Sequence, residues 1–339
     1  MTACWLSKLL PINSMKNFIL ALLATTALAG CETAVNLPEP PHTPRVALMY
    51  TLTTAPLDSS FQALFEERQL YISNSQRVFS TAELKGRADA TVELRDAAGR
   101  VVEHYRSIIT GANPQYGYPG QAGYYRPVLG FRPQVGQAYT LRATLPGLET
   151  AESTLKMPTP AVIESATYAP RTAPGTGSSQ FTGRLSVVLR DDPGTANYYL
   201  AFARVLDQQG QPGSWSPVDV DYNSQSNSAS IGQFQLSSPR QQYSLYPFAD
   251  TDVNGQRITM ASDVRFYSNC YQGNCPQPAF VEVTVSSITL DAYNFYLSRR
   301  RYYDSDGNPF AEPAPLTSNV RPGYGLFGGA TDVTYRIRL

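Results

Sequence analysis

The sequence predicts a mainly β protein with tandem immunoglobulin-like β-sandwich domains, the second of which has one α-helix near the C-terminus. Charged residues make up 16% of the 339 residues, below the roughly 25% of ordinary globular domains. Aromatic residues make up 11%, and proline occurs 26 times. Short runs of alternating apolar and polar residues are separated by turn residues about every 8 to 12 positions, which is typical of β-sandwiches. Helical solenoids, coiled coils and disordered chains have other compositions and are excluded.

The charge balance and the histidine content exclude several classes of function. The 27 basic and 27 acidic residues cancel, so the chain lacks the basic surface of a nucleic-acid-binding protein. His42 and His104 are the only histidines, too few for a histidine-rich zinc site or a pair of catalytic histidines. The motifs G-x-S-x-G, H-E-x-x-H and the P-loop are absent from the sequence. Paired catalytic carboxylates stay open, because a sequence does not show which carboxylates meet in space.

Residues 1–30 have the pattern of a lipoprotein signal peptide, for which we expect Met15 to be the true start. Lys16 supplies the positive charge, and the apolar run from Phe18 to Leu28 follows it. This run is too short to cross a bilayer, which takes about 20 residues. It ends in Leu-Ala-Gly-Cys, which matches a lipobox. Cys31 is therefore expected to carry the lipid that anchors the chain in a membrane.

Residues 31–44 are predicted to be a tether between the lipid and the folded chain. Four prolines in this segment favour extended backbone and remove amide donors. Glu32, directly after the lipidated cysteine, is similar to an acidic signal that directs lipoproteins to the cell surface. A single acidic residue leaves both the cell-surface and the periplasmic face open.

Residues 45–157 are predicted to form the first immunoglobulin-like sandwich. Val92 and Leu94 alternate with polar neighbours, and the turn from Asp96 to Gly99 leads into a returning strand. His104 lies in that strand, where a packed or solvated histidine is expected rather than a catalytic one.

Residues 158–339 form the second predicted domain, which follows a proline-rich seam. Two hairpins are expected, with turns at Asp192-Pro193-Gly194 and at Asn254-Gly255. A helix is predicted over about residues 290–303, where Thr289 is placed to cap the first turn. The arginines at 299–301 suit its negative end, and an anion site is the alternative interpretation. The residues expected on its buried face are Leu290, Tyr293, Tyr296 and Leu297.

The cysteines predict one disulfide bond. Cleavage of the leader removes Cys4, and lipidation uses Cys31. In an oxidising envelope the remaining Cys270 and Cys275 should pair across the tight turn between them. A redox or metal site is the alternative, although the C-x-x-C spacing and a nearby histidine are missing from the sequence.

A tyrosine-rich segment is the expected contact surface. Tyr116, Tyr118, Tyr124 and Tyr125 lie among glycines and prolines. Tyrosines on a surface loop offer a large contact area at low entropic cost, and could stack on sugar rings or fill a partner's grooves. The alternative is a loop packed on itself over the end of the sandwich. The expected ligand is a glycan or a peptide.

A weak calcium candidate lies in the second domain. Asp250, Asp252, Asn254 and Gly255 repeat the first half of a calcium loop, in which alternate side-chain oxygens converge on the cation. The twelfth position is Ala261 instead of a bidentate glutamate. A plain hairpin turn is therefore the favoured interpretation, and no other cofactor is expected.

Several of these segments resemble a known family. The lipobox, the run DDPGTANYY at 191–199, the turn at 250–255 and the closing run at 293–329 are similar to Bacteroidetes lipoproteins of the domain-of-unknown-function 4249 family. The most specific part is NPFAEP at 308–313, followed by SNV and the glycine-rich run that begins at Gly323. The glycines there should carry the chain from the helix back across the sheet to a last strand. The resemblance implies an outer-membrane location and a role beside a TonB-dependent receptor, and it implies no catalytic residues.

The expected function is therefore that of a non-catalytic envelope lipoprotein, an accessory or ligand-binding subunit at a TonB-dependent transporter. Two alternatives remain open. One is an envelope hydrolase that uses paired carboxylates, and the other is a structural or adhesive surface module.

Overall fold

The structure is a computed structural model that describes most of the chain. The described residues are 39–54, 68–77, 80, 82, 84–110, 120–171, 180–221, 236–237, 245–267, 278–305 and 314–339. They belong to two compact units, and only residues 39–41 and Arg77 fall in the first. All elements below belong to the second unit.

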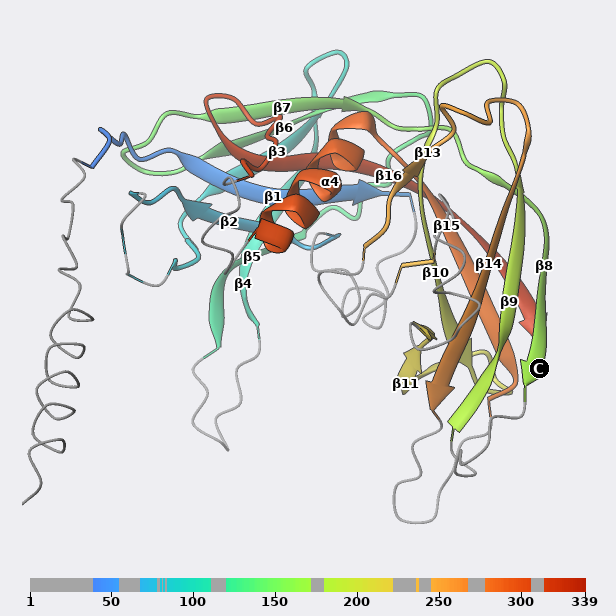
Figure 1. Cartoon of the computed structure of the whole chain (residues 1–339). Helices are drawn as coiled ribbons and strands as arrows, with labels where there is room; N and C mark the ends of the chain where they lie inside the picture. The colour runs from blue at the N-terminus through green and yellow to red at the C-terminus, as the bar shows by residue number, and fades with distance from the viewer. Residues whose placement is uncertain are drawn as a thin grey trace, which may run out of the picture. The chain divides into compact units, whose positions relative to one another are not determined.

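Two β-sheets make up nearly all of this unit (Figure 1). The larger sheet contains β1 (Val46–Thr53), β2 (Leu70–Asn74), β3 (Thr91–Asp96), β4 (Val101–Thr110), β5 (Gln121–Pro127), β6 (Ala138–Thr144), β7 (Ala151–Lys156), β10 (Tyr198–Leu206), β11 (Pro212–Pro217), β13 (Phe248–Ala249), β15 (Phe280–Ile288) and β16 (Gly323–Arg338). The smaller sheet contains β8 (Val162–Arg171), β9 (Gln180–Arg190), β12 (Asp219–Val220) and β14 (Arg257–Tyr267). Within the described ranges the one α-helix is α4 (Leu290–Ser305). The prediction of a mainly β fold with a helix near the C-terminus is confirmed, while the tandem immunoglobulin-like arrangement stays a prediction.

The strands of the N-terminal half form a nearly closed ring. Their order is β16-β1-β2-β5-β4-β3-β6-β7. The ring closes where Glu152 on β7 and Arg321, just before β16, exchange two backbone hydrogen bonds of 2.7 and 2.9 Å. Alternate residues of these strands point inward, so Leu48, Leu94 and Leu141 share one buried core.

The long strand β16 joins the two halves of the larger sheet. Residues Gly323–Ala330 pair in parallel with β1, and Ala330–Arg338 pair in antiparallel fashion with β15. Phe327 points into the N-terminal core, whereas Leu326 points to the opposite face. The glycine-rich run was predicted to lead into the last strand, but it is part of that strand. Strand β16 therefore pairs with strands from both ranges predicted for the domains, 45–157 and 158–339.

The C-terminal half is a sandwich. The smaller sheet, with the order β12-β14-β9-β8, packs on β10, β15 and the end of β16. Figure 1 shows β8, β9 and β14 side by side over this part of the larger sheet. Strand β10 is buried on both faces: Ala201 and Ala203 face the sandwich core, and Leu200 and Phe202 face α4. Burial on both faces explains why this strand is apolar almost throughout.

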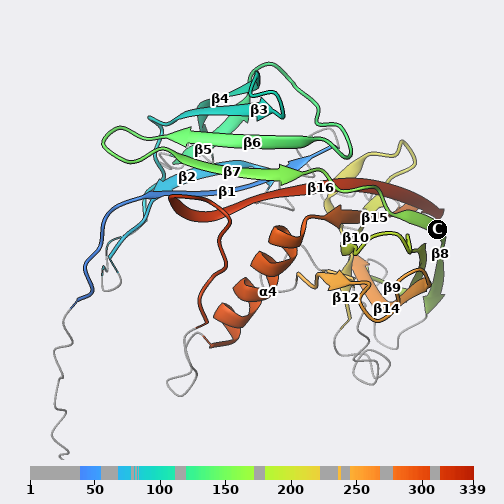
Figure 2. The ribbon, with the colours of Figure 1, turned by 90° about the horizontal axis from the view of Figure 1, so that it is seen from above.

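Helix α4 lies on the face of β16 that is opposite the N-terminal strands (Figure 2). The predicted cap is confirmed, because the Thr289 hydroxyl accepts a hydrogen bond from the Ala292 N–H at 3.4 Å. The predicted buried face is partly wrong, since Leu290 is 50% exposed. The residues that are buried on α4 are Ala292, Phe295, Tyr296 and Ser298.

The end of α4 also differs from the prediction. The helix continues to Ser305, so the arginines at 299–301 lie before its last turn. The guanidinium carbon of Arg300 lies 4.5 Å from the centre of the Tyr246 ring, which gives this arginine a cation–π contact. Among the helices in the described ranges, none has the length and apolar character needed to cross a bilayer.

A buried ion pair lies where the two halves of the larger sheet meet. Arg68 and Asp332 form it, and their side chains are 4% and 3% exposed. Arg68 also donates to the Ser286 hydroxyl at 2.9 Å, and the Thr53 hydroxyl donates to Asp332 at 3.0 Å. The hydrogen bonds therefore connect β1, β15 and β16 with the segment before β2, which fixes the join between the two halves.

Candidate functional site

A cavity formed by described residues lies beside β5. Its volume is about 520 Å³. We name it the tyrosine groove and define it by its lining residues, which are Tyr71, Leu84, Lys85, Gly86, Gly120, Gln121, Ala122 and Tyr124. Strands β2 and β5 and the segment before β3 contribute these residues. The tyrosine groove is therefore made of three stretches that are separated in the sequence.

Two tyrosine rings form one wall of the tyrosine groove. Tyr71 and Tyr124 are directly opposite each other in the β2–β5 pairing. Their ring centroids lie 4.9 Å apart, with an angle of 58° between the ring planes. Both side chains are half-buried, whereas the next residue, Tyr125, points to the other face of the sheet and is 2% exposed. The alternation of β5 thus directs Tyr124 into the tyrosine groove.

Two glycines allow the backbone segments around the tyrosine groove to lie in close contact. A Cβ atom on Gly86 would lie 2.0 Å from the carbonyl oxygen of Ala122. A Cβ atom on Gly123, whose φ is 99°, would lie 2.8 Å from the Tyr71 ring. The Arg87 N–H donates to the Ile72 carbonyl oxygen at 2.9 Å and ties this segment to β2. Because backbone contacts set its shape, the tyrosine groove is preformed.

The polar side chains around the tyrosine groove are suited to ligand binding. Lys85 and Gln121 are exposed, and Leu84 is 47% exposed. The Lys85 ammonium makes no ion pair with another residue that the structure describes. The rings can stack on a flat apolar surface, while the amide and the ammonium can bind hydroxyl or acidic groups. This combination is typical of small-molecule and saccharide sites.

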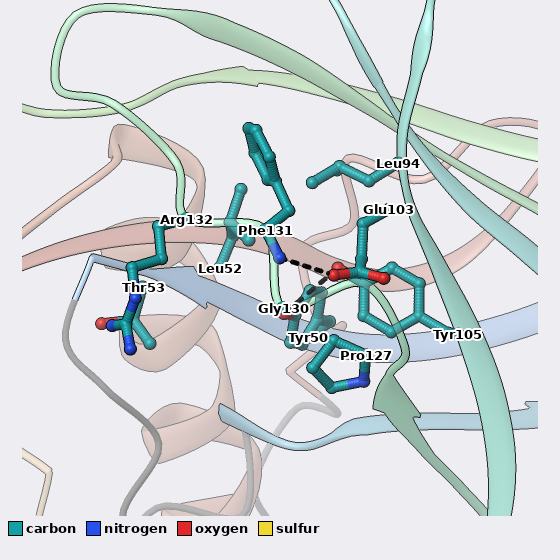
Figure 3. Close-up of a pocket in the computed structure, with 10 residues that line it drawn as sticks. All are labelled: Tyr50, Leu52, Thr53, Leu94, Glu103, Tyr105, Pro127, Gly130, Phe131 and Arg132. Atoms are coloured by element: carbon teal, nitrogen blue, oxygen red, sulfur yellow. Dashed lines mark hydrogen bonds between the residues drawn. The ribbon is translucent and has the colours of Figure 1, made fainter.

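A second cavity, of about 170 Å³, lies inside the N-terminal half (Figure 3). Glu103 on β4 is 1% exposed, and its carboxylate points at the loop that follows β5. The carboxylate accepts hydrogen bonds from the N–H groups of His104 and of three loop residues, Val128, Leu129 and Phe131, at 2.7 to 2.9 Å. Burial alone would raise the pKa of this carboxyl, but these four donors hold it below its ordinary value. Glu103 therefore has a structural role in fixing this loop.

The paired tyrosines in this cavity are also structural. Tyr105 donates a hydrogen bond to the Tyr50 hydroxyl at 3.3 Å, and their rings meet edge to face at 5.6 Å. Burial raises the pKa of Tyr50 to about 12, so its hydroxyl keeps its proton in neutral solution. The two side chains therefore fill the core as neutral groups.

A third cavity, of about 340 Å³, adjoins the turn between β9 and β10. Asp191 lines it and accepts hydrogen bonds from the Tyr199 hydroxyl at 2.7 Å and from the Gly255 N–H at 2.8 Å. Asp250, 1% exposed, accepts a hydrogen bond from the Asn197 N–H at 2.9 Å. Burial is the main cause that raises the pKa of Asp250. Through these hydrogen bonds the two carboxylates connect the turn at 192–194 with the turn at 254–255.

These contacts bear on the calcium candidate. The Asp250 carboxylate accepts a hydrogen bond from the Asn197 N–H, which is a structural contact, while Asp252 and Asn254 are exposed on the turn. In the part of the chain that the structure describes, no group of three or more His, Cys, Asp or Glu side chains is placed to hold a metal ion. A plain turn accounts for the positions of these residues without a cation. The two predicted hairpins are wrong, however, because the turns at 192–194 and 250–255 each connect a strand of one sheet to a strand of the other: β9 to β10, and β13 to β14.

The structure places the remaining predicted residues as follows. Cys31, Cys270, Cys275, Tyr116 and Tyr118 lie outside the described residues. Tyr124 lines the tyrosine groove. Tyr125 is a correction to the predicted contact surface, because it is buried in the core. Its hydroxyl donates to the Arg87 carbonyl oxygen at 2.8 Å and accepts from the Ala90 N–H at 2.9 Å.

A family model described as "Domain of unknown function (DUF4249)" matches residues 57–336. The chain belongs to this family. The match covers the tyrosine groove, the Glu103 loop and the two joined turns, so all three belong to the DUF4249 domain. The description of the DUF4249 family assigns no activity.

Other comparisons add little to DUF4249 membership. No curated protein matches the chain. A solved structure described as "Biofilm associated protein - BSP domain" is 6% identical, with a TM-score of 0.13. That likeness covers 87% of this chain and 59% of the other, so the chain spans about 59% of the length of that structure. It is too weak to bear on the fold or function of the DUF4249 domain.

Of the eight residues that line the tyrosine groove, sequence reasoning predicted only Tyr124. Tyr71 lies in the run ERQLYISNS, whose pattern predicts a strand but no binding site, and Lys85 precedes a glycine with no motif around it. A signal was present at Tyr71, because it alternates with buried Leu70 and Ile72 and must point to the other face. The partner strand could not be predicted, since the pairing of β2 with β5 spans a long stretch of sequence.

Proposed function

We propose that this chain is a non-catalytic, lipid-anchored outer-membrane protein that binds a saccharide in the tyrosine groove, as an accessory subunit of a TonB-dependent transporter. One observation carries the binding role: two tyrosines paired across neighbouring strands wall a preformed cavity of about 520 Å³. Ligand sites commonly have volumes of roughly 300 to 1,000 Å³.

The chemistry of the tyrosine groove favours a saccharide. One face of a sugar ring is apolar and stacks on aromatic rings, and its hydroxyls need hydrogen-bond partners. Tyr71 and Tyr124 supply the rings, and Gln121 supplies an amide that can both donate and accept. Because glycine contacts fix the backbone, little ordering entropy is lost when a ligand binds.

The location rests on the sequence. The apolar run that ends at Cys31 supports lipid anchoring, and the family resemblance supports a transporter as partner. When the full-length protein is purified from its native envelope in mild detergent, a TonB-dependent transporter should co-purify with it. Mass spectrometry identifies the transporter. The variant Cys31→Ala should lose both the lipid and the transporter. Recovery of the wild-type protein without any such transporter would contradict this part of the proposal.

Removal of the two rings should abolish saccharide binding. The double variant Tyr71→Ser/Tyr124→Ser takes away the stacking surface and is expected to weaken binding by about tenfold or more. The measurement is retention of the full-length chain on an array of neutral and acidic oligosaccharides.

The matched control is Tyr335→Ser, because Tyr335 is a 37% exposed tyrosine on β16 outside the tyrosine groove. It should bind like the wild type. If the double variant is unstable, Gln121→Ala changes an exposed residue at the rim and should still weaken binding. Equal binding by the wild type, Gln121→Ala and a folded double variant would rule out the tyrosine groove as the site.

A further inference from the structure

The outer face of β4 and β5 carries two arginines next to the tyrosine groove. On β5, Tyr124 and Arg126 point to this face, while Tyr125 points into the core. Arg106 on β4 is directly opposite Arg126 in the antiparallel pairing. Two residues along a strand span about 6.7 Å, so the arginine pair lies within the reach of a ligand that stacks on Tyr124.

Among the residues that the structure describes, the two arginines have no carboxylate partner. Both are exposed, and neither makes a hydrogen bond or ion pair through its side chain to another described residue. Like charges directly opposite each other on neighbouring strands destabilise a sheet. The pair therefore destabilises the sheet locally, and the described residues show no structural contact that offsets this.

Elsewhere this chain places a carboxylate between neighbouring arginines. Glu282 lies between Arg204 and Arg336, at 2.8 and 2.7 Å. Asp263 lies between Arg171 and Arg184, at 2.6 and 2.9 Å.

The closest comparison is in the smaller sheet. Arg190 and Arg257 are also directly opposite each other, and there Glu164 binds Arg257 at 2.6 Å. Arg106 and Arg126 have the same opposed register, but no acidic side chain in the described ranges binds either of them.

We infer that the ligand supplies this acidic group: the tyrosine groove binds an acidic saccharide whose carboxylate or sulfate lies between Arg106 and Arg126, while a neighbouring sugar ring stacks on Tyr124. The inference rests on the proposed saccharide-binding function and names the class of saccharide. Guanidinium groups bind carboxylates and sulfates through paired, charge-assisted hydrogen bonds. Lys85 adds a further positive charge at the rim of the tyrosine groove.

The alternative acidic ligand is a peptide rich in Asp or Glu. The tyrosine groove favours the saccharide, because its wall is aromatic and its one exposed aliphatic lining residue is Leu84. A peptide would leave the flat faces of the rings with fewer suitable partners. The test therefore has to distinguish binding of an acidic peptide from binding of an acidic saccharide.

The test compares three probes by isothermal titration calorimetry with the full-length chain: an oligomer of galacturonic acid, the neutral galactose oligomer of the same length and linkage, and an oligomer of glutamate. The galacturonate oligomer should bind at least about tenfold more tightly than the other two, since hydrogen bonds between charged groups are the strong ones. Arg106→Gln and Arg126→Gln should each remove most of this preference. Added salt should reduce it in the wild type.

The matched controls are Arg190→Gln and Arg257→Gln, which remove one charge from the comparable pair in the smaller sheet. They should bind all three probes like the wild type. Melting temperatures of all four variants show whether each is folded.

Three results would overturn the inference. If the neutral oligomer binds as tightly as the acidic one and depends on Tyr71 and Tyr124, the saccharide function stands and the acidic class is wrong. If the glutamate oligomer binds most tightly, the ligand class is peptide. If the galacturonate oligomer does not bind, or binds equally to folded Arg106→Gln and Arg126→Gln variants, the arginine pair has no role in binding.

Discussion

The variant Gly325→Ala is expected to lose about 4 kcal/mol or more of unfolding free energy, because residue 325 has no space for a side chain. A Cβ atom there would lie 1.8 Å from the carbonyl oxygen of Leu48 on β1. The φ angle of 111° is one that side chains rarely adopt. The obstacle is backbone in a buried strand, so it is removed only when β16 separates from β1. Urea unfolding, followed by circular dichroism, measures the loss.

The matched control for this variant is Gly99→Ala. Gly99 also has a positive φ, 78°, but a Cβ atom there would have no neighbour within 4 Å. Its expected cost is about 1 to 3 kcal/mol, the cost of the backbone conformation alone. Equal losses in the two variants would show that contact with β1 is not the reason for glycine at 325.

The variant Asp332→Ala should also be strongly destabilised. It leaves the buried Arg68 guanidinium without its carboxylate, and removal of one partner of a buried ion pair costs about 3 to 5 kcal/mol. The double variant Arg68→Met/Asp332→Leu should recover much of this loss, since apolar replacements of a buried pair are often neutral. Urea unfolding of Arg68→Met, Asp332→Leu and the double variant gives the coupling energy. A double variant as unstable as the sum of the single variants would mean that the two side chains act independently.

The same ion pair predicts how stability depends on pH. Burial alone would raise the pKa of Asp332, but Arg68 and the hydroxyls of Ser286 and Thr53 hold it below its ordinary value of 3.8. Because the folded-state pKa is lower than the unfolded one, the stabilisation is complete above about pH 4 and is lost as the pH falls through the folded-state value. The free energy of unfolding of Asp332→Ala should lack this part of the acid dependence.

The sequence predicted the local structure better than the long-range pairing. The alternation around Val92 and Leu94 correctly predicted strands, and the Thr289 cap marked the start of α4. These features depend on residues that are close together in the chain. The parallel pairing of Val46 with Gly323 depends on residues near opposite ends of it, and the sequence contains no local sign of that pairing.

The buried face of α4 shows a different limit. Leucine and tyrosine at helical spacing suggested the stripe, but small Ala292 sits where the helix approaches β16, and a Cβ atom on Gly328 would lie 3.0 Å from it. Close packing selected a small residue, which hydrophobicity alone does not predict.

The candidate site was predicted only in part, for the same reason. Tyr124 was recognised from its loop composition, but the roles of Arg106 and Arg126 depend on a cross-strand register that the sequence does not show. Glu103 is in sequence an ordinary charged residue of a strand. Only the return of the loop at Val128–Phe131 shows why a carboxylate is buried there.

The last strand also sets the order in which this protein can fold. Strand β16 follows the other described strands in the sequence, and it supplies Phe327 to the N-terminal core and Leu326 to the packing of α4. The ring of N-terminal strands therefore stays open until β16 has been made, and closure then requires contacts between distant parts of the chain, which form slowly.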